Sequence, residues 1–217
     1  KGLEFDKYRD FGPDEDASSI DWKASLRANK LTARQYIEER DLKFVFVVDV
    51  GENMLFGSSE KLKCEYAAEV IAALSHMIIG SGDNVGYILY SDKINKYAPP
   101  KKGVKQFNIF IEELANPGNY GGGSRFGVAL DFLLNYIRNV DAAFFVSDFI
   151  GVKDNIYKKL VLASNSFECI GIMIKDPLDK RMPNVNREIV VEDPISGEHI
   201  LINPSKIKEV YGRLAYD

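Results

Sequence analysis

The amino-acid sequence predicts an α/β fold with a mostly parallel sheet and helices on both faces of that sheet. Strand-length apolar runs alternate along the chain with segments whose apolar residues recur at helical spacing. The run at residues 44–48 is apolar throughout, which is typical of a strand buried on both faces of a parallel sheet. A chain of 217 residues, 46% of them hydrophobic, is long enough to bury one full core.

Each further element of the predicted core has its own signal. Apolar residues recur at every fourth position from Leu62 to Ile78, which predicts a helix over residues 59–79 that ends at Gly80. A strand at 84–90 is followed by an antiparallel edge strand at 93–97, which is expected to stop before Pro99 and Pro100. The remaining elements are, in order, a helix from Val104 to before Pro117, a glycine-rich loop at 119–123, a helix at 126–137, a strand at 142–147, a helix at 156–163 and a strand at 167–174.

Segments at both ends fall outside this alternation, so three regions are expected. Residues 1–41 form an N-terminal leader packed on the core, with an extended stretch at 32–39 and a helix start in which Ser18 and Asp21 are spaced as in a capping box. Residues 42–180 form the core. Residues 181–217 form a C-terminal hairpin, with strands at 188–192 and 199–202, and a short helix from Pro204, all within the same globular unit.

The composition argues against several classes of protein. The formal net charge is −4, whereas a dedicated nucleic-acid-binding domain is normally strongly basic. No apolar run approaches the roughly 20 residues that span a bilayer, so no membrane segment is predicted within this chain, and an anchor upstream of Lys1 stays open. Cys64 and Cys169 fall in segments expected to be buried, which predicts reduced thiols in a cytoplasmic protein.

Most catalytic constellations are missing from the sequence. The two histidines, His76 and His199, lack zinc-ligand spacing, and neither cysteine has the context of a nucleophile. The loop at 118–124 is as rich in glycine as a phosphate-binding loop, but it lacks the essential lysine and follows a helix, so no nucleotide site is expected. Five lysines between residues 93 and 105 leave two interpretations open, a solvated sheet edge or a docking patch for an acidic partner.

Two acids stand at the ends of predicted strands, Asp49 after the first strand and Asp148 after the strand at 142–147. Function in parallel sheets usually lies at the carboxyl ends of strands, so both are candidate site residues. Together with Gly51, Asn53 and Ser124, they resemble the metal-ion-dependent adhesion site of von Willebrand factor A domains. The leader resembles the signature of the family called domain of unknown function fifty-eight, which places such a domain behind it; the matching stretches are 8–14 (Tyr-Arg-Asp-Phe-Gly-Pro-Asp), 20–25 (Ile-Asp-Trp-Lys-Ala-Ser) and 38–40 (Glu-Glu-Arg).

The resemblance implies a von Willebrand factor A-like (Rossmann-like) three-layer sandwich, with a mostly parallel sheet and one antiparallel edge strand. It also implies that Asp49, Asn53, Ser124 and Asp148 would be the ligands of Mg²⁺ or another divalent cation. The family pattern is Asp-x-Ser-x-Ser with a later Thr. Here Gly51 supplies no side-chain oxygen and Asn53 offers an amide in place of a hydroxyl, so weak or absent metal binding is expected.

By the same resemblance, the expected function is non-enzymatic. Such proteins act as adaptors beside a MoxR-type AAA+ ATPase and its client proteins, in the assembly or maturation of complexes. Docking is expected through Met54, Phe56, Tyr120 and Arg125, in the two loops at the carboxyl end of the sheet. For residues 54–56 the alternative stays open that their side chains pack under the neighbouring loop instead. Exposed aromatic and methionine side chains are common anchors of protein interfaces.

Two other functions are alternatives to the adaptor. A metal-assisted phosphoesterase would use Asp49 and Asp148 with a bound divalent ion and an activated water, but no histidine base is expected nearby. An extracellular adhesion domain is disfavoured because the sequence has no glycosylation sequon and no disulfide-like cysteine pattern.

Overall fold

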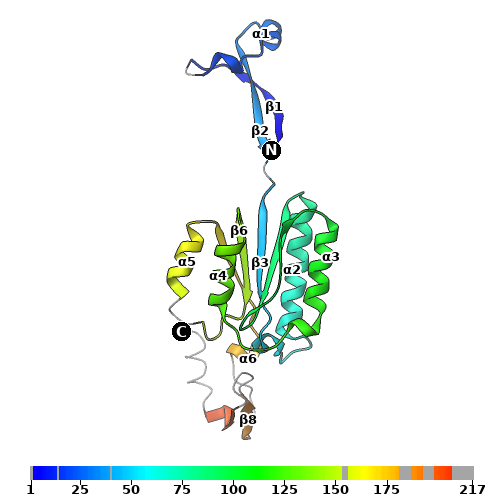
Figure 1. Cartoon of the computed structure of the whole chain (residues 1–217), viewed down its shortest axis with the longest axis vertical. Helices are drawn as coiled ribbons and strands as arrows, with labels where there is room; N and C mark the ends of the chain where they lie inside the picture. The colour runs from blue at the N-terminus through cyan, green and yellow to red at the C-terminus, as the bar shows by residue number, and fades with distance from the viewer. Residues whose placement is uncertain are drawn as a thin grey trace. The chain divides into compact units, whose positions relative to one another are not determined.

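The computed structural model of the protein describes residues 2–13, 15–39, 41–152, 156–180, 187–192 and 198–206. The chain divides into two compact units, Lys1–Asp41 and Leu42–Asp217. Figure 1 shows the elements of both units. The expected division into leader, core and C-terminal hairpin, and the packing of the leader on the core, stay predictions.

A five-stranded sheet forms the centre of the second unit. Its strands lie in the order β5-β4-β3-β6-β7, and every neighbouring pair is parallel except β4 with β5. The apolar run that predicted a strand buried on both faces is β3, the middle strand. The strands are β3 (Lys43–Asp49), β4 (Asn84–Tyr90), β5 (Ile94–Lys101), β6 (Ala142–Ser147) and β7 (Glu168–Met173).

Helices cover both faces of this sheet, as Figure 1 shows. Helices α2 (Lys63–Gly80) and α3 (Val104–Ala115) pack with one set of β3 side chains, Phe46 and Val48. Helices α4 (Phe126–Tyr136) and α5 (Tyr157–Ser164) pack with the other set, Val45 and Val47. Successive strand residues point to opposite faces, so β3 contributes to two separate apolar clusters. The predicted α/β architecture with a mostly parallel sheet is confirmed.

The predicted end of the edge strand is wrong. β5 continues through Pro99 and Pro100 to Lys101. An edge strand needs hydrogen-bond donors on one side only, so it tolerates proline better than a central strand does. The two prolines also lie where the register of β4 with β5 shifts, opposite the stretch between Val85 and Tyr87. The five lysines between residues 93 and 105 are exposed along β5 and the start of α3, so both interpretations of them stay open.

The predicted start of α2, the first α-helix of the second unit, is also wrong. α2 begins at Lys63 rather than at residue 59, because the chain bends at residues 58–61. The side chain of Glu65 folds back and accepts a hydrogen bond from the Leu62 backbone N–H at 2.7 Å, which satisfies one of the free donors at a helix start.

The first unit is a β-hairpin whose connection contains a short helix. β1 (Gly2–Asp10) pairs antiparallel with β2 (Thr32–Glu39), and between them lie the 3₁₀ turn η1 (Ala17–Ser19) and α1 (Trp22–Ala28). Asp21 caps α1, because its Oδ1 accepts hydrogen bonds from the backbone N–H groups of Lys23 and Ala24, both at 3.0 Å. Its Oδ2 accepts from Arg34 Nε at 2.7 Å, so one carboxylate ties the helix to β2.

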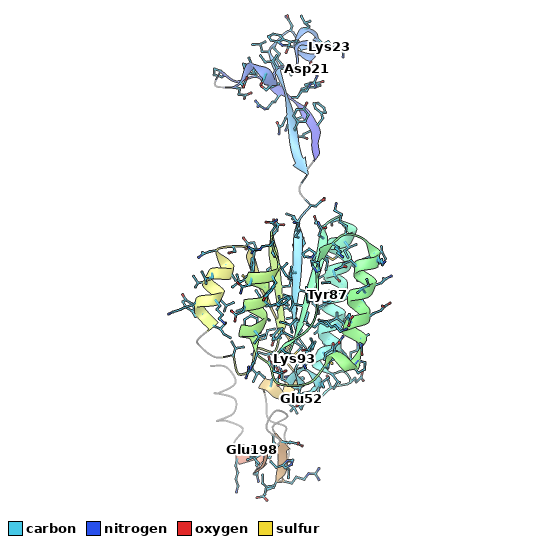
Figure 2. The ribbon with its side chains drawn as sticks, viewed as in Figure 1. Asp21, Lys23, Glu52, Tyr87, Lys93 and Glu198 are labelled. Carbon is cyan, nitrogen blue, oxygen red and sulfur yellow. The ribbon has the colours of Figure 1, made fainter. Side chains whose placement is uncertain are left out.

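The expected capping box of Ser18 and Asp21 is wrong. Ser18 lies in η1, where its N–H donates to the side chain of Asp16 at 2.9 Å. The helix begins at Trp22, directly after Asp21. Asp16 therefore caps η1 and Asp21 caps α1. The spacing of Ser18 and Asp21 only resembles a capping box. Figure 2 labels Asp21 and Lys23 at this end of α1.

The C-terminal part contains the predicted hairpin, formed by β8 (Ile189–Glu192) and β9 (His199–Ile202). A helical turn includes Pro204, and the rest of the expected terminal helix lies outside the described residues. Cys64 is buried, Cys169 is half-buried, and both are free thiols. Within the part of the chain that the structure describes, no helix combines the length and the apolar character needed to cross a membrane.

Candidate functional site at the carboxyl edge of the sheet

The candidate site lies where three neighbouring parallel strands end. Asp49 is the last residue of β3, Tyr90 is the last of β4, and Ser147 is the last of β6, with Asp148 directly after it. Parallel neighbours bring their carboxyl ends to one edge of the sheet, which explains why residues far apart in sequence meet here. Figure 2 labels Glu52 and Lys93 at this edge.

Asp49 is only 1% exposed, and donors of the chain surround its carboxylate. Its Oδ2 accepts hydrogen bonds from the hydroxyl of Ser124 at 2.7 Å and from that of Ser147 at 2.8 Å. Its Oδ1 accepts from the backbone N–H of Gly51 at 2.9 Å. These bonds replace the water that a buried carboxylate loses.

Asn53 bridges the two acids of the site. Its Nδ2 lies 2.9 Å from Asp148 Oδ1 and 3.2 Å from Asp49 Oδ2, so one amide group donates to both carboxylates. Asp148 Oδ1 also accepts from the backbone N–H of Ile150 at 3.0 Å. The residues predicted as metal ligands, Asp49, Asn53, Ser124 and Asp148, therefore do gather in one place.

Gly51 makes room for this amide. A Cβ atom at Gly51 would lie 2.5 Å from Asn53 Oδ1 and 3.1 Å from Asp49 Oδ1. The φ angle of Gly51 is −66°, which any residue can adopt, so glycine is needed here for space rather than for backbone conformation. Asn53 Oδ1 is buried and accepts no hydrogen bond, because the amide directs its nitrogen at the acids.

Lys63 belongs to the site, although sequence reasoning missed it. Its Nζ lies 2.9 Å from Asp148 Oδ2 and 2.9 Å from Asp179 Oδ2, and its side chain is 4% exposed. Burial, the largest single effect, lowers the pKa of Lys63, but the hydrogen bonds and charges of Asp179 and Asp148 outweigh it and raise that pKa above its ordinary value. The ammonium group is therefore charged at neutral pH.

The position of Lys63 becomes a signal once the true start of α2 is known, because the sequence predicted a start at residue 59. Lys63 is the first residue of α2, where the positive end of the helix dipole disfavours a cation. A lysine at that position suggests carboxylates opposite it. Asp179, in the short helix α6 (Pro177–Lys180), lies 116 positions further along the chain, so no local spacing could identify it.

A second set of bonds attaches α6 to the loop before α2. Asp176 accepts from the Ser58 backbone N–H at 2.7 Å and from the Ser58 hydroxyl at 2.5 Å. Burial tends to raise the pKa of Asp176, but the bonds from Ser58 and Leu178 lower it overall. Asp179 Oδ2 accepts from the Asp176 N–H at 2.8 Å, so both anchors belong to one network.

The thiol and the phenol nearest to this edge are held protonated. Burial raises the pKa of Cys64, and the charge of Glu65 adds to the effect. Burial raises the pKa of Tyr90 well above its ordinary value, and the charge of Asp49 adds to it. A protonated thiol is a poor nucleophile, so these groups favour a structural role.

The two histidines have their contacts elsewhere. The ring of His76 in α2 packs edge-on against the ring of Phe107, with the ring centroids 5.6 Å apart. In β9, Nδ1 of His199 lies 3.9 Å from Oε2 of Glu192. Neither observation supports a general base beside Asp49 and Asp148.

The donor set at this edge does not fit a divalent cation. Hard cations take oxygen ligands, but Gly51 offers none, Asn53 presents N–H groups, and Asp148 is paired with the ammonium of Lys63. Among the residues that the structure describes, no group of three or more His, Cys, Asp or Glu side chains could hold a metal. The predicted ligands form a hydrogen-bonded network instead.

The prediction of Met54 as an exposed docking residue is wrong. Met54 is 0% exposed, because the 3₁₀ turn η2 (Glu52–Leu55) directs it into the core cluster of α2 and α3. The next two residues, Leu55 and Phe56, are each 41% exposed. The Phe56 ring centroid lies 5.6 Å from Lys63 Nζ, so this loop also contacts the ion pairs that Lys63 forms with Asp148 and Asp179.

The other two predicted docking residues differ in exposure. Arg125 is exposed. Tyr120 is half-buried and donates its hydroxyl to the Leu114 carbonyl at 2.8 Å, and burial raises the pKa of Tyr120 to about 12. Tyr120 therefore holds the glycine-rich loop against α3 as well as bordering the surface.

An apolar groove of about 470 Å³ lies beside these loops. Its walls come from η2, both helices of one sheet face and the loop after α3. The lining includes Leu55, Leu62, Ala68, Leu114, Pro117 and Tyr120.

Comparison with protein families matches residues 7–216 to the family described as "Protein of unknown function DUF58". The chain belongs to this family. The match includes both units, so the hairpin with α1 and the sheet with its carboxyl-edge site are parts of one DUF58 region.

The DUF58 chain is 27% identical, over 198 residues, to uncharacterized proteins of Mycobacterium bovis and Mycobacterium tuberculosis. The alignment includes 90% of this chain and 62% of those proteins, so the chain spans less than two thirds of the curated relatives that it matches.

Two solved structures resemble the DUF58 chain in fold. One is an aerotolerance-related membrane protein from Bacteroides fragilis with multiple mutations to serines (TM-score 0.52, 14% identity, 81% of this chain and 88% of that chain). The other is the conserved hypothetical protein BatB from Bacteroides thetaiotaomicron (TM-score 0.51, 13% identity, 79% of this chain and 87% of that chain). At these identities the likeness shows the fold alone.

Proposed function

We propose that the chain is a non-enzymatic adaptor domain of the von Willebrand factor A-like type, which docks on a MoxR-type AAA+ ATPase during the assembly or maturation of protein complexes. The observation that carries this proposal is the apolar groove at the carboxyl edge of the sheet, with Leu55 and Phe56 exposed beside it. Apolar side chains gathered at a groove are typical of a protein-docking surface. A cytoplasmic location is part of this proposal, because the proposed partner uses ATP.

The chemistry of the edge favours binding over catalysis. Both candidate carboxylates, Asp49 and Asp148, already accept hydrogen bonds from side chains of the protein. The buried thiol of Cys64 is protonated, as its raised pKa indicates. No observation supports a phosphoesterase that would use the same two acids.

The proposed docking surface consists of Leu55, Phe56 and the groove wall at Leu62, with Arg125 on the neighbouring loop. It replaces the docking surface expected from sequence in two respects. Met54 is excluded because it is fully buried, and Tyr120 is assigned to holding the loop rather than to contacting the partner.

The proposal is tested by calorimetric titration of the purified chain with a purified MoxR-type ATPase from the same genome, with ATP and with ADP. Leu55→Ser, Phe56→Ala and Arg125→Ala are the test variants. Truncating an interface anchor usually costs more than about 1 kcal/mol, so at least one variant should weaken binding by about tenfold. The melting midpoints of Leu55→Ser and Arg125→Ala should stay near that of the wild type, since both side chains are exposed. Binding by Phe56→Ala is compared below its own melting midpoint, because its ring contacts Lys63.

Met77→Ala is the matched control, because Met77 is an apolar side chain of α2 that is 64% exposed and lies outside the groove lining. It should bind like the wild type. The proposal is wrong if the wild type does not bind the ATPase, or if all three test variants bind as tightly as Met77→Ala does.

A further inference from the structure

Asp148, one of the two buried acids at the carboxyl edge, has a positive partner within the chain. The ammonium of Lys63 lies between Asp148 and Asp179, at 2.9 Å from a carboxylate oxygen of each. The side chains of Lys63 and Asp148 are 4% and 1% exposed, so water screens this pair very little. A charge that is buried to this extent requires a counter-charge, and here Lys63 supplies it.

The amide of Asn53 occupies the space between the acids. Its Nδ2 donates to Asp148 at 2.9 Å and to Asp49 at 3.2 Å. The hydrogens of this amide are the positive ends of its N–H bonds. A cation between the two carboxylates would meet those hydrogens, and turning the amide over would remove one donor from each acid.

The amide fits only because residue 51 is a glycine. A Cβ at Gly51 would approach Asn53 Oδ1 to 2.5 Å, which is too close for unbonded atoms. The departures from the family pattern at residues 51 and 53 are therefore one matched change, and Lys63 completes it with a charge.

We propose that the ammonium of Lys63, together with the amide of Asn53, replaces the divalent cation of a metal-ion-dependent adhesion site. The chain keeps the arrangement of Asp49, Ser124 and Asp148 without a metal. Any partner that docks at this edge therefore does so without a metal bridge to these residues.

The first test uses the wild-type chain. Titration with Mn²⁺, followed by calorimetry and by the paramagnetic relaxation of water protons, should show no saturable site. The melting midpoint should be the same in Mg²⁺ as in a chelator at equal ionic strength. One saturable Mn²⁺ site, or a midpoint that rises with Mg²⁺, would overturn the proposal.

The second test removes the ammonium with Lys63→Met, which keeps most of the apolar stem. Removing one partner of a buried ion pair leaves the other charge uncompensated, so the midpoint should fall by on the order of 10 °C. Lys61→Met is the matched control, because Lys61 pairs with Glu69 at the surface, where the two side chains are 44% and 59% exposed. Equal midpoints for the two variants would contradict the role assigned to Lys63.

The third test attempts to restore a metal site. G51S/N53S alone should gain no Mn²⁺ binding, because the ammonium stays in place, whereas G51S/N53S/K63M should bind Mn²⁺ saturably and melt higher with it than without it. Tight binding by the double variant would show that Lys63 does not exclude the metal. If the triple variant does not fold, the wild type and the double variant still decide the outcome.

Discussion

Gly51 and Asn53 depend on each other through a single steric contact. The backbone at Gly51 would accept any residue, since its φ angle is −66°, but the Asn53 amide lies where a side chain would begin. A larger residue at position 51 would displace the amide from Asp49 and Asp148. The buried acids would then lose donors that water cannot replace.

Gly51→Ala is therefore expected to destabilise the chain by about 1–3 kcal/mol, the usual cost of leaving a buried polar group without its partner. Gly123→Ala is the control, because a Cβ there meets nothing within 4 Å and its φ is not positive. Chemical denaturation of both variants measures the difference. In an Asn53→Ala background, Gly51→Ala should cost much less, and additive costs would contradict the contact.

The limits of sequence reasoning at this scale follow from particular residues. Asp49 and Asp148 could be placed together because strand ends in a parallel sheet meet at one edge. Met54, Leu55 and Phe56 are three successive apolar residues, and nothing in their order indicates that the turn buries only the first. The bond of Lys63 to Asp148 joins residues 85 positions apart, which no local pattern records.

Among the elements, α1 depends most clearly on one side chain. Asp21 caps the helix through the N–H groups of Lys23 and Ala24 and binds Arg34 on β2. The backbone bond from Ala24 is the largest cause, and the bond from Arg34 the next, of a lowered pKa of Asp21, which falls from 3.8 to about 2. The lowered pKa means that the folded chain favours the ionised carboxylate of Asp21 more than the unfolded chain does. Asp21 therefore stabilises the folded chain at any pH at which the carboxylate of the unfolded chain is also ionised.

This shift predicts a specific acid sensitivity of the first unit. The contribution of Asp21 is complete above a pH of about 4 and is lost as the pH falls through about 2. Trp22 is the only tryptophan of the chain and follows Asp21 directly, so its fluorescence reports on α1. Asp21→Asn should destabilise α1 at neutral pH and should reduce the acid-dependent change in Trp22 fluorescence.

Asp10→Asn is the control for this titration, because Asp10 lies in the same unit and pairs with Lys30 at the surface. It should keep the acid transition of the wild type. An unchanged transition in Asp21→Asn would show that other acids of the hairpin control it.

The edge strand shows where element prediction fails. Pro99 and Pro100 were expected to stop the strand, since proline lacks the donor that a ladder needs. They lie within β5, where the register with β4 shifts and where one side of the strand pairs with no other strand that the structure describes. Whether a proline ends a strand depends on its neighbours in the sheet, which the local sequence does not contain.

For the whole molecule, the two units draw on separate sets of residues. Both apolar clusters of the sheet unit consist of residues between Val45 and Ile174. The hairpin unit ends at Asp41. Its helix and its second strand are joined by the hydrogen bond between Asp21 and Arg34. A unit of this size buries little apolar surface and is expected to be marginally stable.

We therefore expect urea to unfold the units in two steps. Trp22 fluorescence follows the hairpin unit, whereas far-UV circular dichroism is dominated by the helices α2 to α5 of the sheet unit. The fluorescence midpoint should lie at the lower urea concentration. A chain that begins at Leu42 should keep the dichroism midpoint of the full chain.

Coincident midpoints, or a lower midpoint for the shortened chain, would contradict this expectation. Either result would instead support the sequence-based prediction that the leader packs on the core. The fold class itself was predictable, because the alternation of apolar strands with helices follows directly from burial on both faces of a sheet.

The mutual dependence of Gly51, Asn53 and Lys63 also restricts how this chain can diverge. Gly51→Ser alone collides with the amide, and Lys63→Met alone leaves two carboxylates without their cation. Asn53→Ser alone removes the bridging donor. Each of these single substitutions toward a metal-binding site is therefore expected to lower the stability of the chain, although the combined change need not. Sign epistasis of this kind predicts that a metal site is reached from this chain only when positions 51, 53 and 63 change together.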